Sequence, residues 1–185
     1  MTAVRKPKPD VRLRHHELAL RFLALRDSFA EYRPPLKRVL NDFMRANRYV
    51  DGDVANSMKA AFDGAVGNVF AVFQERSFKR VRVATSRTGV QSERWDSAIN
   101  RAVYDTQMVC LADHDRDSLV VERDNVLGTF RALCLDDPEF QNSVSKATAD
   151  RTSFQYRLAR FASALVDIGI RSDRLERIAL LRAVD

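Results

Sequence analysis

The sequence predicts an all-α protein, a single helical bundle of about six to seven helices. Three observations favour this fold class. Turn-forming residues are scarce, with 6 Gly and 5 Pro in 185 residues, apolar residues recur at helical spacing along most of the chain, and the length suits one domain with a sizeable core. We expect a flexible basic tail over residues 1–10 and a helical domain over residues 11–185.

The first half of the chain divides into four predicted helices. The first ends at Pro34-Pro35, where the second begins, because proline is tolerated only in the first turn of a helix. Asp53 as N-cap opens a third helix that extends to about Gln74, and Asp96 opens a fourth. The apolar stripes of these helices are Leu18, Phe22, Leu25 and Phe29; Leu36, Val39, Leu40, Phe43 and Met44; Met58, Phe62, Ala65, Val69 and Phe73; and Ile99, Val103 and Cys110.

The second half predicts shorter helices with clear end signals. Asp137 caps a short segment that opens at Pro138, and Gly169 ends a helix that begins before Phe154. A last helix begins at Ser172 or Asp173. The apolar stripes here are Val126, Phe130 and Leu133; Phe154, Leu158, Phe161, Leu165 and Ile168; and Leu175, Ile178 and Leu181.

Helical periodicity fails near residues 77–94, where we expect an exposed basic loop. Thr88-Gly89 favours a turn, and the alternation of Val81, Arg82 and Val83 leaves a short strand as an alternative. Basic residues in this segment are offset only by Glu93, and they are Lys79, Arg80, Arg82, Arg87 and Arg94.

The positive charge is concentrated at the N-terminal end. Residues 1–50 hold 12 Lys/Arg against 5 Asp/Glu, within a formal net charge of +6 for the whole chain. Such asymmetry is typical of contact with nucleic acid or an acidic partner, although a solvated basic face is the commoner cause. The nucleic-acid-binding candidates are Arg12, Arg14, Lys79, Arg80, Arg82, Arg87 and Arg94.

No segment predicts membrane insertion or export. No run approaches the roughly 18 to 20 apolar residues of a membrane span, and the first residues lack the apolar stretch of a signal peptide. We therefore expect a cytoplasmic protein without membrane contact. Cys110 and Cys134 lie in apolar surroundings and are expected to be buried free thiols.

Motifs of the common enzyme classes are missing from the sequence. It contains no phosphate-binding loop, no Gly-x-Ser-x-Gly elbow and no His-Glu-x-x-His pair. Asp113–Asp117 resembles the start of a calcium loop, but Ser118 stands where that loop needs glycine. We expect no metal, no cofactor and no complete catalytic site, with metal-dependent nuclease chemistry at Asp113–Asp117 or Glu122 as the enzyme alternative.

Three arginines lie inside apolar helical stretches, namely Arg21, Arg101 and Arg157. A guanidinium there must be paired or must reach solvent along its stem. Pairing within the bundle is one interpretation. The other has these arginines bind phosphate or the carboxylates of a partner.

Several segments carry a resemblance to a known family. They are Glu17 to Leu25, Tyr32, Leu40 to Asn47, Phe78-Lys79-Arg80, Ile99 to Asp105 and Thr152 to Arg157. In order and spacing they resemble the helical C-terminal part of the N-terminal module of GmrSD-type restriction endonuclease proteins. The resemblance covers about residues 12–170.

The resemblance implies that the family's catalytic activity belongs to a partner protein and not to this chain. Members of the family begin with a ParB-like α/β region whose Asp-Gly-Gln-Gln-Arg motif is implicated in nucleotide hydrolysis, and many end in a His-Asn-His nuclease domain. This sequence has neither and begins where the helical half would begin. It is thus expected to be half of a module, a non-catalytic interaction subunit for a ParB-like protein from an adjacent bacterial gene.

Four residues are the candidates for facing that partner or a phosphate. Arg21, Asn100 and Arg101 match the family pattern, and Arg157 is added as a further buried-helix arginine. The expected setting is a DNA-targeting or anti-phage defence system. The alternative is a stand-alone basic helical protein that binds nucleic acid, either DNA or RNA.

Overall fold

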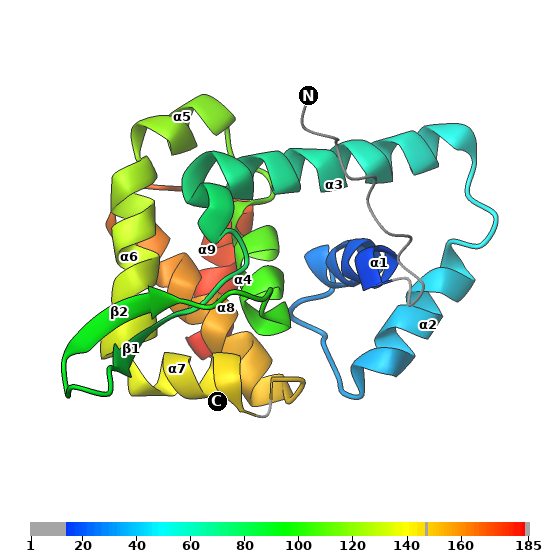
Figure 1. Ribbon diagram of the computed structural model, residues 1–185. Helices are drawn as coiled ribbons and strands as arrows, with labels where there is room; N and C mark the ends of the chain where they lie inside the picture. The colour runs from blue at the N-terminus through cyan, green and yellow to red at the C-terminus, as the bar shows by residue number, and fades with distance from the viewer. Residues whose placement is uncertain (1–13, 147, 184–185) are drawn as a thin grey trace, which may run out of the picture.

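The computed structural model describes residues 14–146 and 148–183, and helices make up most of them (Figure 1). The tail expected over residues 1–10 and the candidate Arg12 lie outside the described residues, as does the side chain of Arg14. None of the helices in the described segments combines the length and apolar content that crossing a bilayer requires.

A helix buried on almost every side, α4 (Arg101–Leu111), forms the centre of the structure (Figure 1). Of its 11 residues, 10 are buried, as expected of a central helix, and the buried set includes the polar residues Asp105, Thr106 and Gln107. It packs against α1 (Arg14–Arg26), α3 (Gly52–Phe73) and α8 (Arg151–Asp167). These neighbours come from both halves of the chain, and α4 therefore joins the two halves into one core.

The C-terminal half adds further helices to this core. They are α5 (Arg116–Val121), α6 (Arg123–Asp136), α7 (Pro138–Ser145), α9 (Asp173–Ala179) and the 3₁₀ helix η2 (Leu180–Ala183). Of these, α7 and α9 contact α4, while α5 and α6 pack on α3. Asp137 caps α7 at its Phe140 N–H, and Ser172 caps α9 at its Leu175 N–H, as the sequence predicts. Gly169, with φ +89°, ends α8 in the left-handed conformation that favours glycine.

The described residues form nine α-helices, more than the six to seven expected. The helix that the sequence pattern does not reveal is α5, which has 6 residues and only Leu119 buried. A helix this short has too few apolar positions to show a stripe. It is separated from α6 by Glu122 alone, whose backbone N–H bonds Ser118 and Val120 carbonyls.

The segment expected to be a basic loop is an antiparallel hairpin of β1 (Val81–Thr85) and β2 (Gln91–Trp95), preceded by the 3₁₀ helix η1 (Gln74–Arg76). The register pairs Val81 with Trp95 and Thr85 with Gln91. The turn predicted at Thr88-Gly89 is present, with Gly89 at φ +80°. Strand formation here depends on Val81, which is fully buried where β1 meets α6.

Two helices begin at residues other than the expected caps. The carboxylate of Asp51, not Asp53, accepts the Val54 N–H and opens α3. Asn100, not Asp96, opens α4. Backbone hydrogen bonds of Asp96 to Arg80 and of Asn100 to Phe78 hold the intervening residues in a non-helical conformation, so the helix starts only after Asn100.

One part of the chain projects from the bundle. We call it the arm: α2 (Leu36–Ala46), the turn at residues 47–51 and the first ten residues of α3, 52–61. Figure 1 shows α2 and this end of α3 at the edge of the molecule, away from α4. No residue of α2 is buried, and the first buried residue of α3 is Ala65.

The core on the other side of α4 contains an aromatic cluster. The Phe130 ring contacts the rings of Phe73, Phe140 and Phe161 at centroid separations of 5.3, 6.0 and 5.4 Å, each near edge-to-face. The cluster joins α3, α6, α7 and α8. Cys110 and Cys134 are buried free thiols, as predicted, and burial raises the pKa of both.

Phe130→Ala should lower the free energy of unfolding by about 3 to 5 kcal/mol, because it leaves a cavity among three fixed rings. Urea unfolding followed by circular dichroism measures the loss. Phe70→Ala is the matched control, since Phe70 lies on α3 with 58% of its surface exposed, and it should cost a small fraction of that amount. Equal losses in the two variants would contradict the assignment of Phe130 to the core.

Candidate functional site

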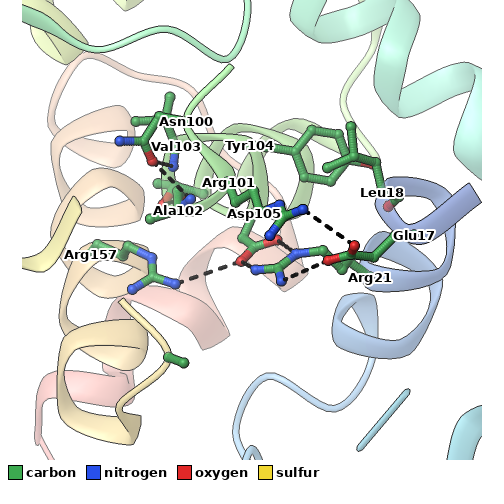
Figure 2. A network of polar contacts seen from close by, with 12 residues as sticks. Glu17, Leu18, Arg21, Asn100, Arg101, Ala102, Val103, Tyr104, Asp105 and Arg157 are labelled. Atoms are coloured by element: carbon green, nitrogen blue, oxygen red, sulfur yellow. Dashed lines mark hydrogen bonds and ion pairs between the residues drawn. The ribbon is translucent and has the colours of Figure 1, made fainter. Parts of the chain in front are cut away.

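The centre of the candidate site is the carboxylate of Asp105, which is buried in the middle of α4. Arg21 of α1 binds it with two parallel donors: Nε donates to Oδ1 at 3.0 Å and Nη2 to Oδ2 at 2.5 Å (Figure 2). This two-point geometry is the strong form of an arginine–carboxylate pair. It fixes α1 against α4.

Arg157 of α8 approaches the same carboxylate from the opposite side (Figure 2). Its Nη2 lies 3.7 Å from Asp105 Oδ2, its Nη1 donates to the Ser143 carbonyl at 3.3 Å, and its guanidinium lies 5.1 Å from the centre of the Phe154 ring. Arg157 is only 1% exposed. One carboxylate thus holds two buried guanidinium groups.

The two arginines differ in how well their charge is supported. Burial opposes the charge of Arg21, but the attraction and hydrogen bonds of Asp105, together with Glu17, outweigh it and raise the pKa of Arg21. Burial lowers the pKa of Arg157 to about 10, against the attraction of Asp105. Both groups therefore stay charged at neutral pH, and Asp105 is the nearest counter-charge of Arg157.

The cluster reaches the surface through Glu17 of α1. The Glu17 carboxylate lies 3.9 Å from Arg21 and 3.3 Å from Arg101 (Figure 2). Beside Arg101, the side-chain oxygen of Asn100 accepts hydrogen bonds from the backbone N–H groups of Ala102 and Val103. Its side-chain nitrogen donates a hydrogen bond to the Val144 carbonyl of α7. The end of α4 is therefore anchored to α1 and α7 while Arg101 itself points outward, 55% exposed.

Two hollows adjoin Arg101 on the surface. One, of about 500 Å³, is lined by His15, Leu18, Ala98, Ile99 and Arg101. The other, of about 330 Å³, is lined by Arg80, Asn100, Arg101, Ala102, Val144, Ser145 and Thr148. We call the surface formed by His15, Leu18, Arg80, Ile99, Asn100 and Arg101 the Arg101 face. Its apolar centre is Ile99, which is 49% exposed.

A second charged surface is the outer side of the β hairpin. The register pairs Arg82 with Arg94, and alternate residues share a face, so Arg80, Arg82 and Arg94 lie on one side of the ribbon. The other side carries buried Val81 and the Glu93 carboxylate, which binds Arg131 of α6. The arginine side therefore faces away from α6.

Part of the positive charge on this side of the ribbon is compensated. Asp96 lies 3.3 Å from Arg80 and 3.0 Å from Arg82. Arg87, in the turn, and Arg94 are exposed. These two residues are the ribbon arginines most open to a ligand.

The structure separates the four residues that the sequence nominated as facing a partner or phosphate. Arg21 is 8% exposed and Arg157 is 1% exposed. Both guanidinium groups form ion pairs with Asp105 inside the bundle. Asn100 caps α4 and is partly buried. Arg101 alone among the four is exposed.

The segment Asp113–Asp117 serves the fold. Asp113 binds Arg26 and Arg174, which join α1 to α9, and Asp115 caps α5 at the Ser118 N–H. Within the described residues, no group of three or more His, Cys, Asp or Glu side chains is placed to hold a metal ion.

Asp105 is the site residue that sequence reasoning did not nominate. The sequence does contain a signal for it, because Asp105 is the single acidic residue in α4, a helix that is apolar on most sides. A carboxylate in such a helix requires a positive partner. Arg21 and Arg157, two arginines in apolar stripes, required a negative one.

Comparisons of the chain with protein-family models, with curated proteins and with solved structures find no match. The resemblance to GmrSD-type proteins therefore rests only on the sequence segments that carry it. It contributes to the function only as a proposal.

Asp105→Asn should lower the free energy of unfolding by about 3 to 5 kcal/mol, because it keeps the shape of the side chain but leaves two buried guanidinium groups without a counter-charge. Denaturant unfolding at neutral pH measures the effect. Asp63→Asn removes an exposed carboxylate that binds Lys59 on α3 and should change stability far less. Similar losses for both variants would show that the buried cluster is not a major stabilising element.

Proposed function

We propose that this chain is a non-catalytic helical interaction subunit that binds a separately encoded ParB-like protein through the Arg101 face. The complex would act in a bacterial DNA-targeting or anti-phage defence system. The nucleotide chemistry implied by the family resemblance belongs to the partner. This chain supplies the helical half of the shared module.

The observation that carries the proposal is that separate segments of the family resemblance meet at one surface. Glu17 and Leu18 come from α1, Arg80 from the residues before β1, and Ile99 to Arg101 from the start of α4. These segments are far apart in the chain but line adjacent hollows. Exposed Ile99 and Arg101 supply the combination of apolar and arginine contacts that is common at protein interfaces.

The buried cluster supports this surface. The Arg21–Asp105 pair sets the position of α1 relative to α4, and Glu17 links that pair to Arg101. The pair therefore sets the position of Leu18 on α1 relative to Arg101 on α4, two of the residues that line the larger hollow. A preformed surface of this kind loses less conformational entropy on binding.

Ile99→Asp combined with Arg101→Glu should abolish co-purification of the chain with the ParB-like product of the neighbouring gene. Both side chains are about half exposed, so the variant should fold. The matched control is Val121→Asp combined with Arg171→Glu, exposed positions on α5 and before α9, which should leave the complex intact. The two unaltered proteins eluting separately from gel filtration would overturn the proposal.

A second candidate function is nucleic-acid binding by the hairpin. The observation that favours it is the placement of Arg80, Arg82 and Arg94 on one side of a two-stranded ribbon. A ribbon of this kind fits the major groove of DNA, where arginines contact phosphates and base edges. In this case the chain would hold DNA for the complex or act alone.

Arg87→Ala combined with Arg94→Ala should reduce the salt dependence of DNA binding by about two ion equivalents if each arginine neutralises one phosphate. Fluorescence anisotropy with a short duplex at several salt concentrations measures the slope. Arg171→Ala, which removes an exposed arginine 65% accessible, should leave the slope unchanged. An absence of binding by the unaltered protein at low salt would eliminate this candidate.

A further inference from the structure

The arm has an apolar surface that the rest of the described chain leaves uncovered. Leu36 and Val39, at the start of α2, pack against the core, but the later apolar residues of the arm do not. Met44 is 48% exposed, Tyr49 88% and Val54 40%. The uncovered side chains run from the end of α2 through the turn to α3, and they are Met44, Tyr49, Val50 and Val54, with half-buried Leu40 and Phe43 beside them on α2.

The beginning of α3 is also poorly supported. Its first ten residues include no buried side chain, although the helix continues into a buried second half. Helical turns without tertiary contacts are marginal in water. The Asp51 cap and continuity with the buried half stabilise this end, and a partner would add the missing packing surface.

The two limbs of the arm, each counted with the two or three residues that adjoin it, carry charges of opposite sign. Residues 33–48, around α2, hold five exposed basic residues against Asp42, a net charge of +4. Residues 51–63, at the start of α3, hold Asp51, Asp53 and Asp63 against Lys59, a net charge of −2. The basic residues of the first limb are Arg33, Lys37, Arg38, Arg45 and Arg48.

From this pattern we infer that the arm is a homodimer interface, with α2 of one chain against the start of α3 of a second copy. A two-fold axis brings the α2 of each chain against the start of α3 of the other chain. Each of these two contacts then joins apolar surface to apolar surface and a basic limb to an acidic limb. Nucleic acid or an anionic membrane would match the basic limb but repel the acidic one. The inference is independent of the proposed function, because the Arg101 face is formed by other residues.

Sedimentation velocity of the full chain tests the inference between about 1 and 100 µM, a range that brackets a micromolar dissociation constant. The expected species has about twice the 21.1 kDa mass of one chain. Met44→Glu should raise the dissociation constant at least tenfold, since it places a negative charge against the acidic limb of the other copy. Val121→Glu, at a side chain 80% exposed on α5, is the control and should not change it.

Charge reversal gives a stricter test. Replacing Lys37, Arg38 and Arg45 by Glu makes both limbs negative, and replacing Asp53 and Asp63 by Lys makes both positive. Each variant alone should be monomeric, whereas an equimolar mixture should form a heterodimer because each limb then meets its opposite. Recovery on mixing would exclude misfolding as the cause of the monomers.

Two results would overturn the inference. One is an unaltered chain that is monomeric over the whole concentration range, which would mean that another protein or residues 1–13 cover the arm. The other is a dimer that the arm substitutions leave unchanged. The Ile99→Asp, Arg101→Glu variant should still form the dimer. Failure of the dimer inference can therefore be distinguished from failure of the proposed partner complex.

Discussion

The Asp105 carboxylate is the constraint on which the rest of the structure depends. It is buried in α4 and neutralises guanidinium groups from α1 and α8, so three helices must meet at one point. Loss of Asp105 leaves two buried guanidinium groups without their shared counter-charge, which costs several kcal/mol. Hydrophobic contacts tolerate small shifts in helix position, whereas the two-point bond between Arg21 and Asp105 does not. The cluster therefore selects one arrangement of α1 and α8 around α4.

The same constraint connects the interior to the surface. Arg21 lies within reach of Glu17, and Glu17 binds Arg101 at the exposed start of α4. Asn100 closes that end by capping α4 and bonding the Val144 carbonyl. The proposed partner surface is thus built on the capped N-terminal end of the central helix. The proposed dimer surface lies on the arm, where no residue of α2 is buried. The two surfaces suit different partners. The Arg101 face is already formed before a partner binds, whereas the arm acquires packing contacts only when a second chain associates with it.

The sequence predicts those parts of the fold that follow local rules. The mainly α-helical class, most of the apolar stripes, and the end signals at Asp137, Gly169 and Ser172 need only neighbouring residues, and the structure confirms them. Met44 and Ile99, which the stripes also included, are exposed. Long-range contacts decide the rest. The cap of α4 moves to Asn100 because backbone hydrogen bonds to residues before β1 hold the preceding residues in a non-helical conformation. The hairpin forms where Val81 is buried beside α6. The sequence marks Arg21 and Arg157 as needing a partner, but their common partner Asp105 becomes evident only when the helices are placed in space.

A double-mutant cycle on Arg21 and Asp105 measures the central interaction most directly. The unaltered protein, Arg21→Met, Asp105→Asn and the double variant are unfolded in denaturant under the same conditions. If the pair holds α1 on α4, the double variant should lose less than the sum of the single losses, with a coupling of at least about 1.5 kcal/mol. Losses that add within about 0.5 kcal/mol would contradict the cluster as the organising contact of the fold.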